Sequence, residues 1–182
     1  MNFAELLTRD YVIVSVKNRM FGNSKSVKKD TIHRMAESAG ATAQRLKGTK
    51  TLLDSPALKV IKATQTEFSA WLKANALPAD EMFRDGCHAL NRDAVPELEE
   101  QHAAAVLAID KALMDWEPTY GDDVYRAQRE LGTEWEPGLL PSWDEVTRSF
   151  GIEYSLMSLS IPEGLDPKTY QAELAKQDAN LK

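Results

Sequence analysis

The chain has little of what most metal and catalytic sites are built from. Its 182 residues include one cysteine, Cys87, and three histidines. A single cysteine cannot form an internal disulfide, so we expect a reducing, cytoplasmic setting. The histidines His33, His88 and His102 show neither the HxxxH nor the HExxH spacing of zinc proteins. The sequence therefore predicts no metal site and no cofactor.

Long apolar runs are also missing, since no stretch approaches the ~20 residues of a membrane span. The opening MNFAELLTRDYVIVSV holds Arg9 and Asp10 inside its apolar run, which is atypical of a signal peptide. We therefore expect no membrane partner. Apolar residues still make up 43% of the chain, which is typical of globular proteins. We expect one globular domain over 1–166 and a short C-terminal helix or frayed tail over 167–182.

Motifs for nucleophilic catalysis and phosphate binding are absent as well. The chain has no GxSxG, and the GNSKS stretch from Gly22 to Ser26 lacks the Walker spacing. Cys87 stands beside His88, but a lone, half-buried thiol is the favoured interpretation of this pair. We predict a non-enzymatic protein and keep a hydrolase with an unrecognised site as an alternative.

Three stretches carry the pattern of β-structure. YVIVSVK, over 11–17, is β-branched and nearly continuous in apolar residues, as in a central strand covered on both faces. EMFRDGCHAL, over 81–90, predicts an extended segment or a hairpin arm. SFGIEYSLMSLSIP, over 149–162, alternates between apolar and polar residues.

The last of these stretches changes parity at Leu156 and Met157. A strand with a period of two cannot place both on one face unless it bends or takes an extra residue. We expect a β-bulge that keeps Leu156, Met157, Leu159 and Ile161 buried. The alternative is a strand covered on both faces, with Met157 against a partner or a second subunit.

Helix signals fill most of the remaining chain. Ser55 and Pro56 suit the start of a helix that ends at Asn75, and Ser142 with Glu145 forms a capping box. Further helices are predicted from Asp30 to Gly48, from Val95 (after Asp93) to Glu117, and over 121–131 before Gly132. Two helices show heptad-like seams: Leu58, Ile61, Gln65, Phe68 and Leu72, then Leu98, His102, Ala105, Ile109, Leu113 and Trp116. The predicted class is α+β, with a helical hairpin or bundle packed on a small antiparallel sheet.

Charge is laid out unevenly. Residues 1–50 hold ten Lys/Arg and four Asp/Glu, whereas residues 51–182 hold twelve and twenty-four. The basic part, with Tyr11 and Phe21 as stacking groups, is typical of a single-strand binding groove. The pI of about 5.2 means that such binding would be local and sensitive to salt. The alternative is that the charges neutralise one another within the fold. The candidate nucleic-acid or anion-binding residues are Arg19, Lys25, Lys28, Lys29 and Arg34.

Four tryptophans suggest a protein interface. Trp135 and Trp143 flank the Pro/Gly loop TEWEPGLLPSW, and aromatic side chains are favoured anchors at interfaces. Together with Met157 they form the candidate partner interface. The alternative is that the tryptophans cover the core.

The order of these features resembles a bacterial and phage family known as domain-of-unknown-function family 3150, over about residues 8–165. The resemblance rests on YVIVSVKNRMF with its lysine-containing loop, the helix start AVPELEE and the final SFGIEYSLMSLSIP. Members are found in phages and mobile elements, often beside genes for AAA+ ATPases of the MoxR type, and have no established activity. This implies an accessory protein and no residue roles.

The leading prediction is a non-enzymatic, cytoplasmic phage or mobile-element protein that binds another macromolecule. The partner would be an AAA+ ATPase or a host defence complex, and the long helices suggest a homo-oligomer. The alternative is a protein that binds or anneals single-stranded DNA through its basic N-terminal segment.

Overall fold

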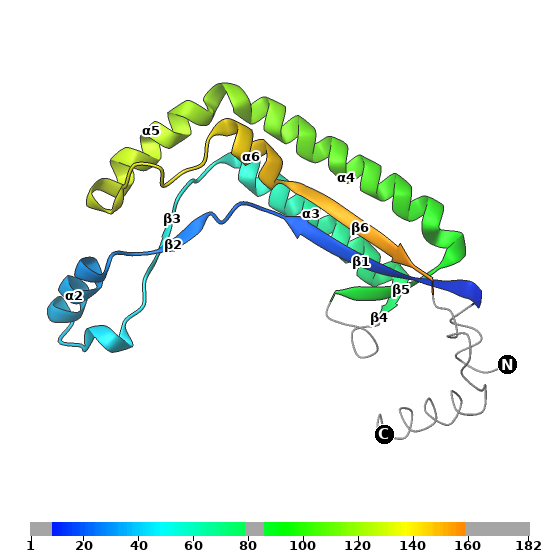
Figure 1. Ribbon diagram of the computed structural model, residues 1–182, viewed down its shortest axis with the longest axis horizontal. Helices are drawn as coiled ribbons and strands as arrows, with labels where there is room; N and C mark the ends of the chain where they lie inside the picture. Colours follow the sequence, from blue (N-terminus) through cyan, green and yellow to red (C-terminus); the bar gives the residue numbers. More distant parts are fainter. Residues whose placement is uncertain (1–8, 79–85, 159–182) are drawn as a thin grey trace, which may run out of the picture. The chain divides into compact units, whose positions relative to one another are not determined.

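The computed structural model describes residues 9–78 and 86–158, and its α+β architecture confirms the predicted fold class. Helices pack on a four-stranded antiparallel sheet of order β4-β5-β1-β6, and β2 pairs with β3 (Figure 1). In chain order the elements are β1 (Tyr11–Arg19), β2 (Ser24–Ser26), α2 (Lys29–Ser38), η1 (Ala43–Arg45), β3 (Thr49–Thr51), α3 (Pro56–Asn75), β4 (Ala76–Pro78), β5 (Cys87–Asn91), η2 (Arg92–Ala94), α4 (Val95–Trp116), η3 (Glu117–Thr119), α5 (Tyr120–Leu131), η4 (Gly132–Glu134), α6 (Trp143–Ser149) and β6 (Gly151–Met157).

Contacts divide the described residues into two compact units. The first holds 9–17, 68–78, 86–102 and 153–158, and the second holds 18–67 and 103–152. The divisions fall inside β1, α3, α4 and β6. A single domain over 1–166 stays a prediction, and the predicted tail over 167–182 lies outside the described residues.

The first unit is built on the pairing of β1 with β5. These strands run antiparallel, from Tyr11 opposite Asn91 to Ser15 opposite Cys87, and β5 also pairs with β4. The hairpin arm predicted for 81–90 is therefore confirmed where the structure describes it. Residues 12–14 of β1 are all buried, which fits a central strand covered on both faces. His102 of α4 packs its ring 4.8 Å from that of Tyr154.

An aromatic cluster forms the centre of the second unit. Trp116, at the end of α4, is 2% exposed, and its ring lies 5.4 Å from that of Tyr120 and 5.7 Å from that of Trp143. The Phe150 ring also packs against Trp116, with 6.4 Å between the two ring centres. Edge-to-face packing of this kind stabilises aromatic pairs beyond the burial of their area.

Several helix boundaries agree with the sequence. The helix α3 begins at Pro56 after Ser55, α5 ends before Gly132, and Ser142 with Glu145 forms the predicted capping box of α6. The seam residues of α3 and α4 are buried apart from Leu58 and His102, which are half-buried. The helix α4 starts at Val95 as predicted, although Asn91 rather than Asp93 supplies the capping oxygen to η2 before it.

The helix predicted from Asp30 to Gly48 is wrong in length. The helix α2 starts at Lys29 and ends at Ser38, so Asp30 lies in its first turn. Gly40 follows with a φ of +60°, a left-handed conformation that glycine adopts without strain and that stops the helix. Gly48 lies against Val27, and a Cβ there would come 2.9 Å from the Val27 side chain. The chain turns back after α2, and this brings Gly48 beside Val27.

The burial predicted for the end of the last strand is wrong at Leu156 and Met157, and the bulge itself stays a prediction. The strand β6 ends at Met157, and Leu156 and Met157 are each 40% exposed, so neither shares a buried face. The change of parity needs no extra residue, because β6 is an edge strand whose end faces solvent. Leu159 and Ile161 lie outside the described residues.

Gln65 is a buried polar side chain in the second unit, and it supports a prediction. Its Nε2 donates to the carbonyl oxygens of Arg19 at 2.9 Å and of Gly151 at 3.1 Å. Gln65→Leu keeps the volume and removes the donor, so the free energy of unfolding should fall by about 1–2 kcal/mol. Glu67→Ala, at an exposed position two residues on, should change it by less than about 0.5 kcal/mol. Urea unfolding of both variants measures the difference, and equal effects would contradict the bridging role.

Candidate functional site

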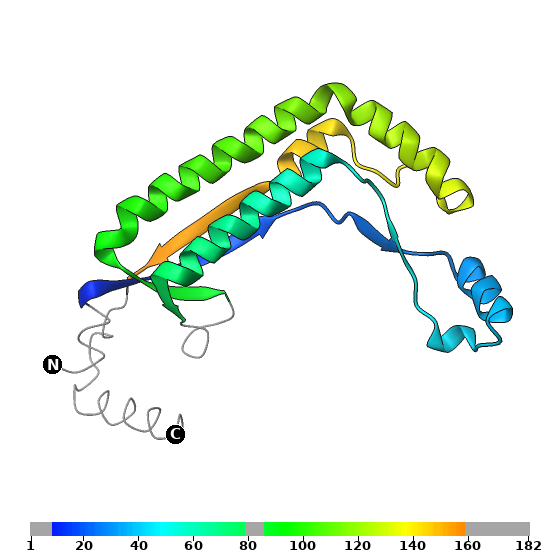
Figure 2. The ribbon, with the colours of Figure 1, turned by 180° about the vertical axis from the view of Figure 1, so that it is seen from behind.

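Residues 24–51 form what we call the basic segment. It comprises β2, α2, η1 and β3, and it contains seven Lys/Arg and two Asp/Glu. Figure 2 shows its two ends running alongside each other as β2 and β3, where Ser24 faces Thr51 and Lys25 faces Lys50. The segment thus begins and ends at neighbouring positions, and it has a high density of positive charge.

Hydrogen bonds between Asn23 and two leucines hold the two ends of the basic segment together. The Asn23 side chain donates to the carbonyl oxygen of Leu53 at 2.6 Å and accepts from the Leu53 N–H at 2.7 Å. The Leu52 N–H donates to the Asn23 carbonyl oxygen at 3.1 Å. Both leucines are buried, so the start and the end of the segment are anchored to the core of the second unit.

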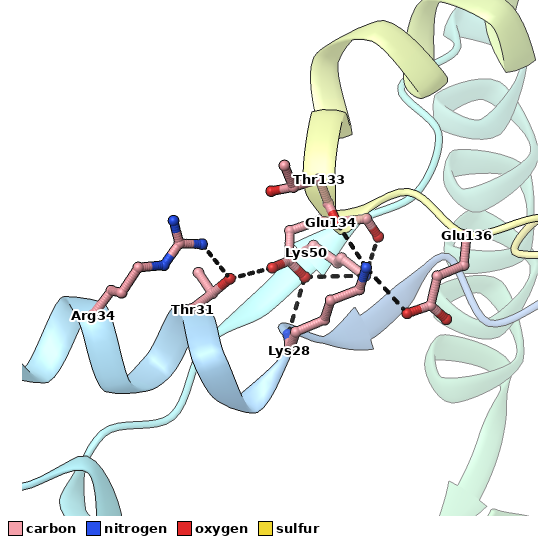
Figure 3. A network of polar contacts seen from close by, with 7 residues as sticks. All are labelled: Lys28, Thr31, Arg34, Lys50, Thr133, Glu134 and Glu136. Carbon is pink, nitrogen blue, oxygen red and sulfur yellow. Dashed lines mark hydrogen bonds and ion pairs between the residues drawn. The ribbon is translucent and has the colours of Figure 1, made fainter.

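A second anchor is the carboxylate of Glu134, in η4 (Figure 3). One of its oxygens accepts from the Lys28 backbone N–H at 3.0 Å and pairs with Lys50 Nζ at 3.2 Å. The other oxygen accepts from the Thr31 hydroxyl. Lys50 also donates to the Glu134 carbonyl oxygen at 2.6 Å. The Lys50 side chain is only 8% exposed, so this ion pair is largely removed from water.

These bonds stabilise the ionised form of Glu134. The Thr31 hydroxyl, the Lys28 N–H and then Lys50 lower the pKa of Glu134 from 4.5 to about 2, against the opposing effect of burial. The carboxylate therefore stays charged across the physiological pH range.

Two of the predicted binding residues have structural roles. Lys28 Nζ donates to the Thr133 carbonyl oxygen at 2.6 Å and lies 3.3 Å from a carboxylate oxygen of Glu136 (Figure 3). Arg19 donates to the Arg148 carbonyl oxygen at 3.3 Å, and its guanidinium passes over Gly151. For Lys28, as for Lys50, the alternative of neutralisation within the fold describes what the structure shows.

The side chains of the other three predicted residues, Lys25, Lys29 and Arg34, are exposed to solvent. None of the exposed cations of the basic segment has a carboxylate within ion-pair distance among residues 9–78 and 86–158, and Arg34 donates only to the Thr31 hydroxyl. Two of them, Arg45 and Lys47, were not among the predicted residues, which end at Arg34 within the predicted helix over 30–48. Gly40, inside that stretch, was the available signal that the helix stops. The exposed cations are Lys25, Lys29, Arg34, Arg45 and Lys47.

The predicted stacking groups are not available beside these cations. The Phe21 ring lies 6.0 Å from that of Phe150, edge to face, and is half-buried. Tyr11 packs in the first unit, against the core cluster that includes Ile13 and Cys87. Residues 24–51 contain no Phe, Tyr or Trp. The basic segment therefore presents its cations without Phe, Tyr or Trp, and its one exposed aromatic ring is the imidazole of His33.

The candidate partner interface is divided between the units. Trp143 is half-buried in the aromatic cluster, with its ring 5.1 Å from that of Tyr120. Trp135 is half-buried in the same unit, whereas Met157 belongs to the first unit and is 40% exposed. The contacts of Trp143 fit the alternative that it covers the core. A partner at these three residues stays a prediction.

A pocket of about 180 Å³ borders the basic segment within the second unit. Trp116 Nε1 donates to Asp123 Oδ2 at 2.8 Å, and Arg126 donates to the other oxygen, so each oxygen of the buried Asp123 carboxylate has a partner. The hydroxyl of Thr51 has no histidine or lysine beside it in the lining, so the hydrolase alternative gains no support here. The lining residues are Thr51, Leu52, Asp54, Asp123, Arg126, Ala127, Glu130 and Leu131.

Cys87 and His88 do not converge. They are adjacent on β5, where neighbouring side chains point to opposite faces of the sheet, and Cys87 is fully buried. Within the described residues, no three His, Cys, Asp or Glu side chains gather as metal ligands would. No helix there combines the length and apolar character that crossing a membrane requires.

Comparison of the chain with family models, curated proteins and solved structures finds no match. The resemblance to family 3150, and the phage setting that it implies, therefore stay predictions.

Glu134 supports a prediction about pH. Because its pKa is lowered on folding, its stabilising effect is complete above pH about 4.5 and is lost as the pH falls toward about 2. Glu134→Gln should therefore destabilise the protein at pH 7, and the difference from the wild type should shrink over that range. Urea unfolding at a series of pH values measures it. Glu145, whose pKa is lowered by the Ser142 N–H and hydroxyl, contributes equally to both proteins and cancels.

The control for this experiment is Glu136→Gln. It removes a carboxylate of the same charge, but Glu136 is 59% exposed and contacts only Lys28 Nζ. Its effect should be smaller and should show little dependence on pH. If both variants behave alike, Glu134 is not the anchor of the basic segment.

The two tryptophans near the Pro/Gly loop provide a matched test of the aromatic cluster. Trp143→Ala removes ring contacts to Trp116 and Tyr120, so the free energy of unfolding should fall by about 2 kcal/mol. Trp135, equally half-buried, has no such ring contact in the described residues, and Trp135→Ala should cost less than about 1 kcal/mol. Thermal and urea unfolding distinguish the two, and a neutral Trp143→Ala would remove Trp143 from the core.

Proposed function

We propose that the chain is a non-enzymatic protein that binds nucleic acid through its basic segment, residues 24–51. The observation that carries the proposal is the set of five cations that this segment exposes, with no carboxylate among the described residues to neutralise them. Lysine and arginine side chains of this kind bind phosphates and release the counterions that surround a nucleic acid.

The acidic remainder of the chain does not oppose this function. Residues 52–182 hold twelve Lys/Arg and twenty-four Asp/Glu, whereas the basic segment has a net charge of +5. Binding depends on the local potential more than on the net charge of the whole protein. The acidic part repels a polyanion, so contact is limited to the basic segment, and the affinity falls steeply with salt.

The anchoring of the segment also favours binding. Asn23 joins its two ends, and Glu134 fixes the start of α2 and the middle of β3. Binding therefore costs less conformational entropy than it would for a free basic tail, since much of the backbone is already ordered.

The second candidate function is a protein adaptor in a phage or mobile element, acting on an AAA+ ATPase or a host defence complex. One observation favours it. Leu107 and Met114 lie one heptad apart on α4 and are 71% and 72% exposed. Residues seven apart lie on one side of a helix, so these two exposed apolar side chains share one side of α4, with the charged Asp110 and Lys111 between them.

Charge reversal tests the nucleic-acid proposal. The triple variant Lys25→Glu, Lys29→Glu and Lys47→Glu should lower the affinity for a labelled oligonucleotide by at least about a hundredfold near 0.1 M salt, because three phosphate contacts are lost. Lys28 is left unchanged because it has a structural role. Fluorescence anisotropy measures the affinity, and circular dichroism checks the fold.

The matched control reverses three exposed lysines elsewhere, Lys62, Lys73 and Lys111, and so changes the net charge equally. It should lower the affinity by much less than the first triple variant. If the two variants lose affinity equally, the proposal fails and the adaptor remains as the candidate function.

A further inference from the structure

The basic segment lacks what proteins use to hold a single strand. Single-strand binders combine a positive groove with aromatic side chains on which successive bases stack. Residues 24–51 contain no Phe, Tyr or Trp. The nearest aromatic residue before the segment, Phe21, is half-buried with its ring against Phe150. The one aromatic ring of the segment is the exposed imidazole of His33, so stacking on its aromatic side chains is limited to a single position.

What the segment does expose is suited to phosphate oxygens. Besides its five cations, the β2–β3 pair carries four exposed hydroxyl residues, with Ser24 opposite Thr51 and Ser26 opposite Thr49. Residues directly opposite in an antiparallel pair lie on the same face of the sheet. Hydroxyl, lysine and arginine groups are the side chains that most often bond the phosphate backbone, which carries no sequence information itself.

We infer that the basic segment binds the phosphate backbone of a nucleic-acid duplex in preference to a single strand, and without sequence specificity. This inference rests on the proposed function. A duplex carries one negative charge per about 1.7 Å of its axis, a higher density than a single strand presents to the same cations. Without stacking to compensate, the form with the higher charge density binds more tightly.

The size of the preference follows from counterion release. The logarithm of the affinity falls with the logarithm of salt concentration by about 0.9 per phosphate contact for a duplex and about 0.7 for a single strand. Five contacts therefore predict slopes of about −4.5 and about −3.5. With equal affinity for the two forms at about 1 M salt, where the charge effect vanishes, this difference makes duplex binding about tenfold tighter at about 0.1 M.

Apart from the single ring of His33, the two arginines are the groups of the segment that offer another route to a single strand, because a planar guanidinium can stack on a base. Arg34 donates from Nη2 to the Thr31 hydroxyl at 3.3 Å, and Arg45 is exposed in η1. The double variant R34K/R45K keeps both charges and removes both planar groups. It distinguishes contact with phosphates from stacking on bases, and it leaves the anchoring residues unchanged.

The experiment compares the full chain with one labelled duplex, a duplex of shuffled sequence, and the separate strands, by anisotropy from about 50 to about 200 mM salt. We expect both duplexes to bind alike, about tenfold tighter than the strands, with the slopes given above. R34K/R45K should bind the duplex within about twofold of the wild type.

Two further results would overturn the inference while the proposed function stands. One is a single strand that binds as tightly as the duplex or more tightly, and the other is a large loss of single-strand affinity in R34K/R45K. If neither form binds in a way that depends on Lys25, Lys29 and Lys47, the proposed function itself fails. The two failures are therefore distinguishable.

Discussion

The carboxylate of Glu134 determines which charges of this protein face solvent. It accepts from a backbone N–H and a hydroxyl of the basic segment and pairs with Lys50, although Lys28 and Glu134 are 106 residues apart in the sequence. A buried carboxylate needs several donors to offset its desolvation, and here all the bonds that its side chain receives come from one short stretch of the chain. The lysines nearest Glu134, Lys28 and Lys50, are bonded within the fold. The other cations of the segment stay exposed to solvent, so one half-buried carboxylate separates the bonded cations from the exposed ones.

Local patterns in the sequence predicted what local forces decide. The β-branched run of β1, the Ser55–Pro56 start of α3 and the capping box at Ser142 depend on residues within a few positions of one another, and the structure confirms each. The buried seams of α3 and α4 followed from helical periodicity for the same reason. The α+β class could thus be predicted from the order of strands and helices.

The sequence could not show contacts between distant residues. The helix α2 is shorter than predicted because the chain leaves the helical conformation at Gly40, whereas the contact of Gly48 with Val27 joins residues that no local pattern connects. The candidate site was affected in the same way. Lys28 and Lys25 look equivalent in the sequence, yet the first is bonded to Thr133 and the second is exposed, because only Lys28 lies beside η4. The position of Trp143 beside a loop likewise suggested an interface residue, whereas its ring packs against Trp116 and Tyr120.

The bonds between Asn23 and Leu53 bring the two ends of the basic segment together. The chain leaves and rejoins the rest of the protein at two adjoining backbone positions, so the length and composition of what lies between can change without rerouting α3. Residues of the segment other than those bonded to η4 can be removed or replaced, whereas those of the aromatic cluster cannot. The exposed surface of the segment can therefore change in composition while the framework of the second unit stays the same.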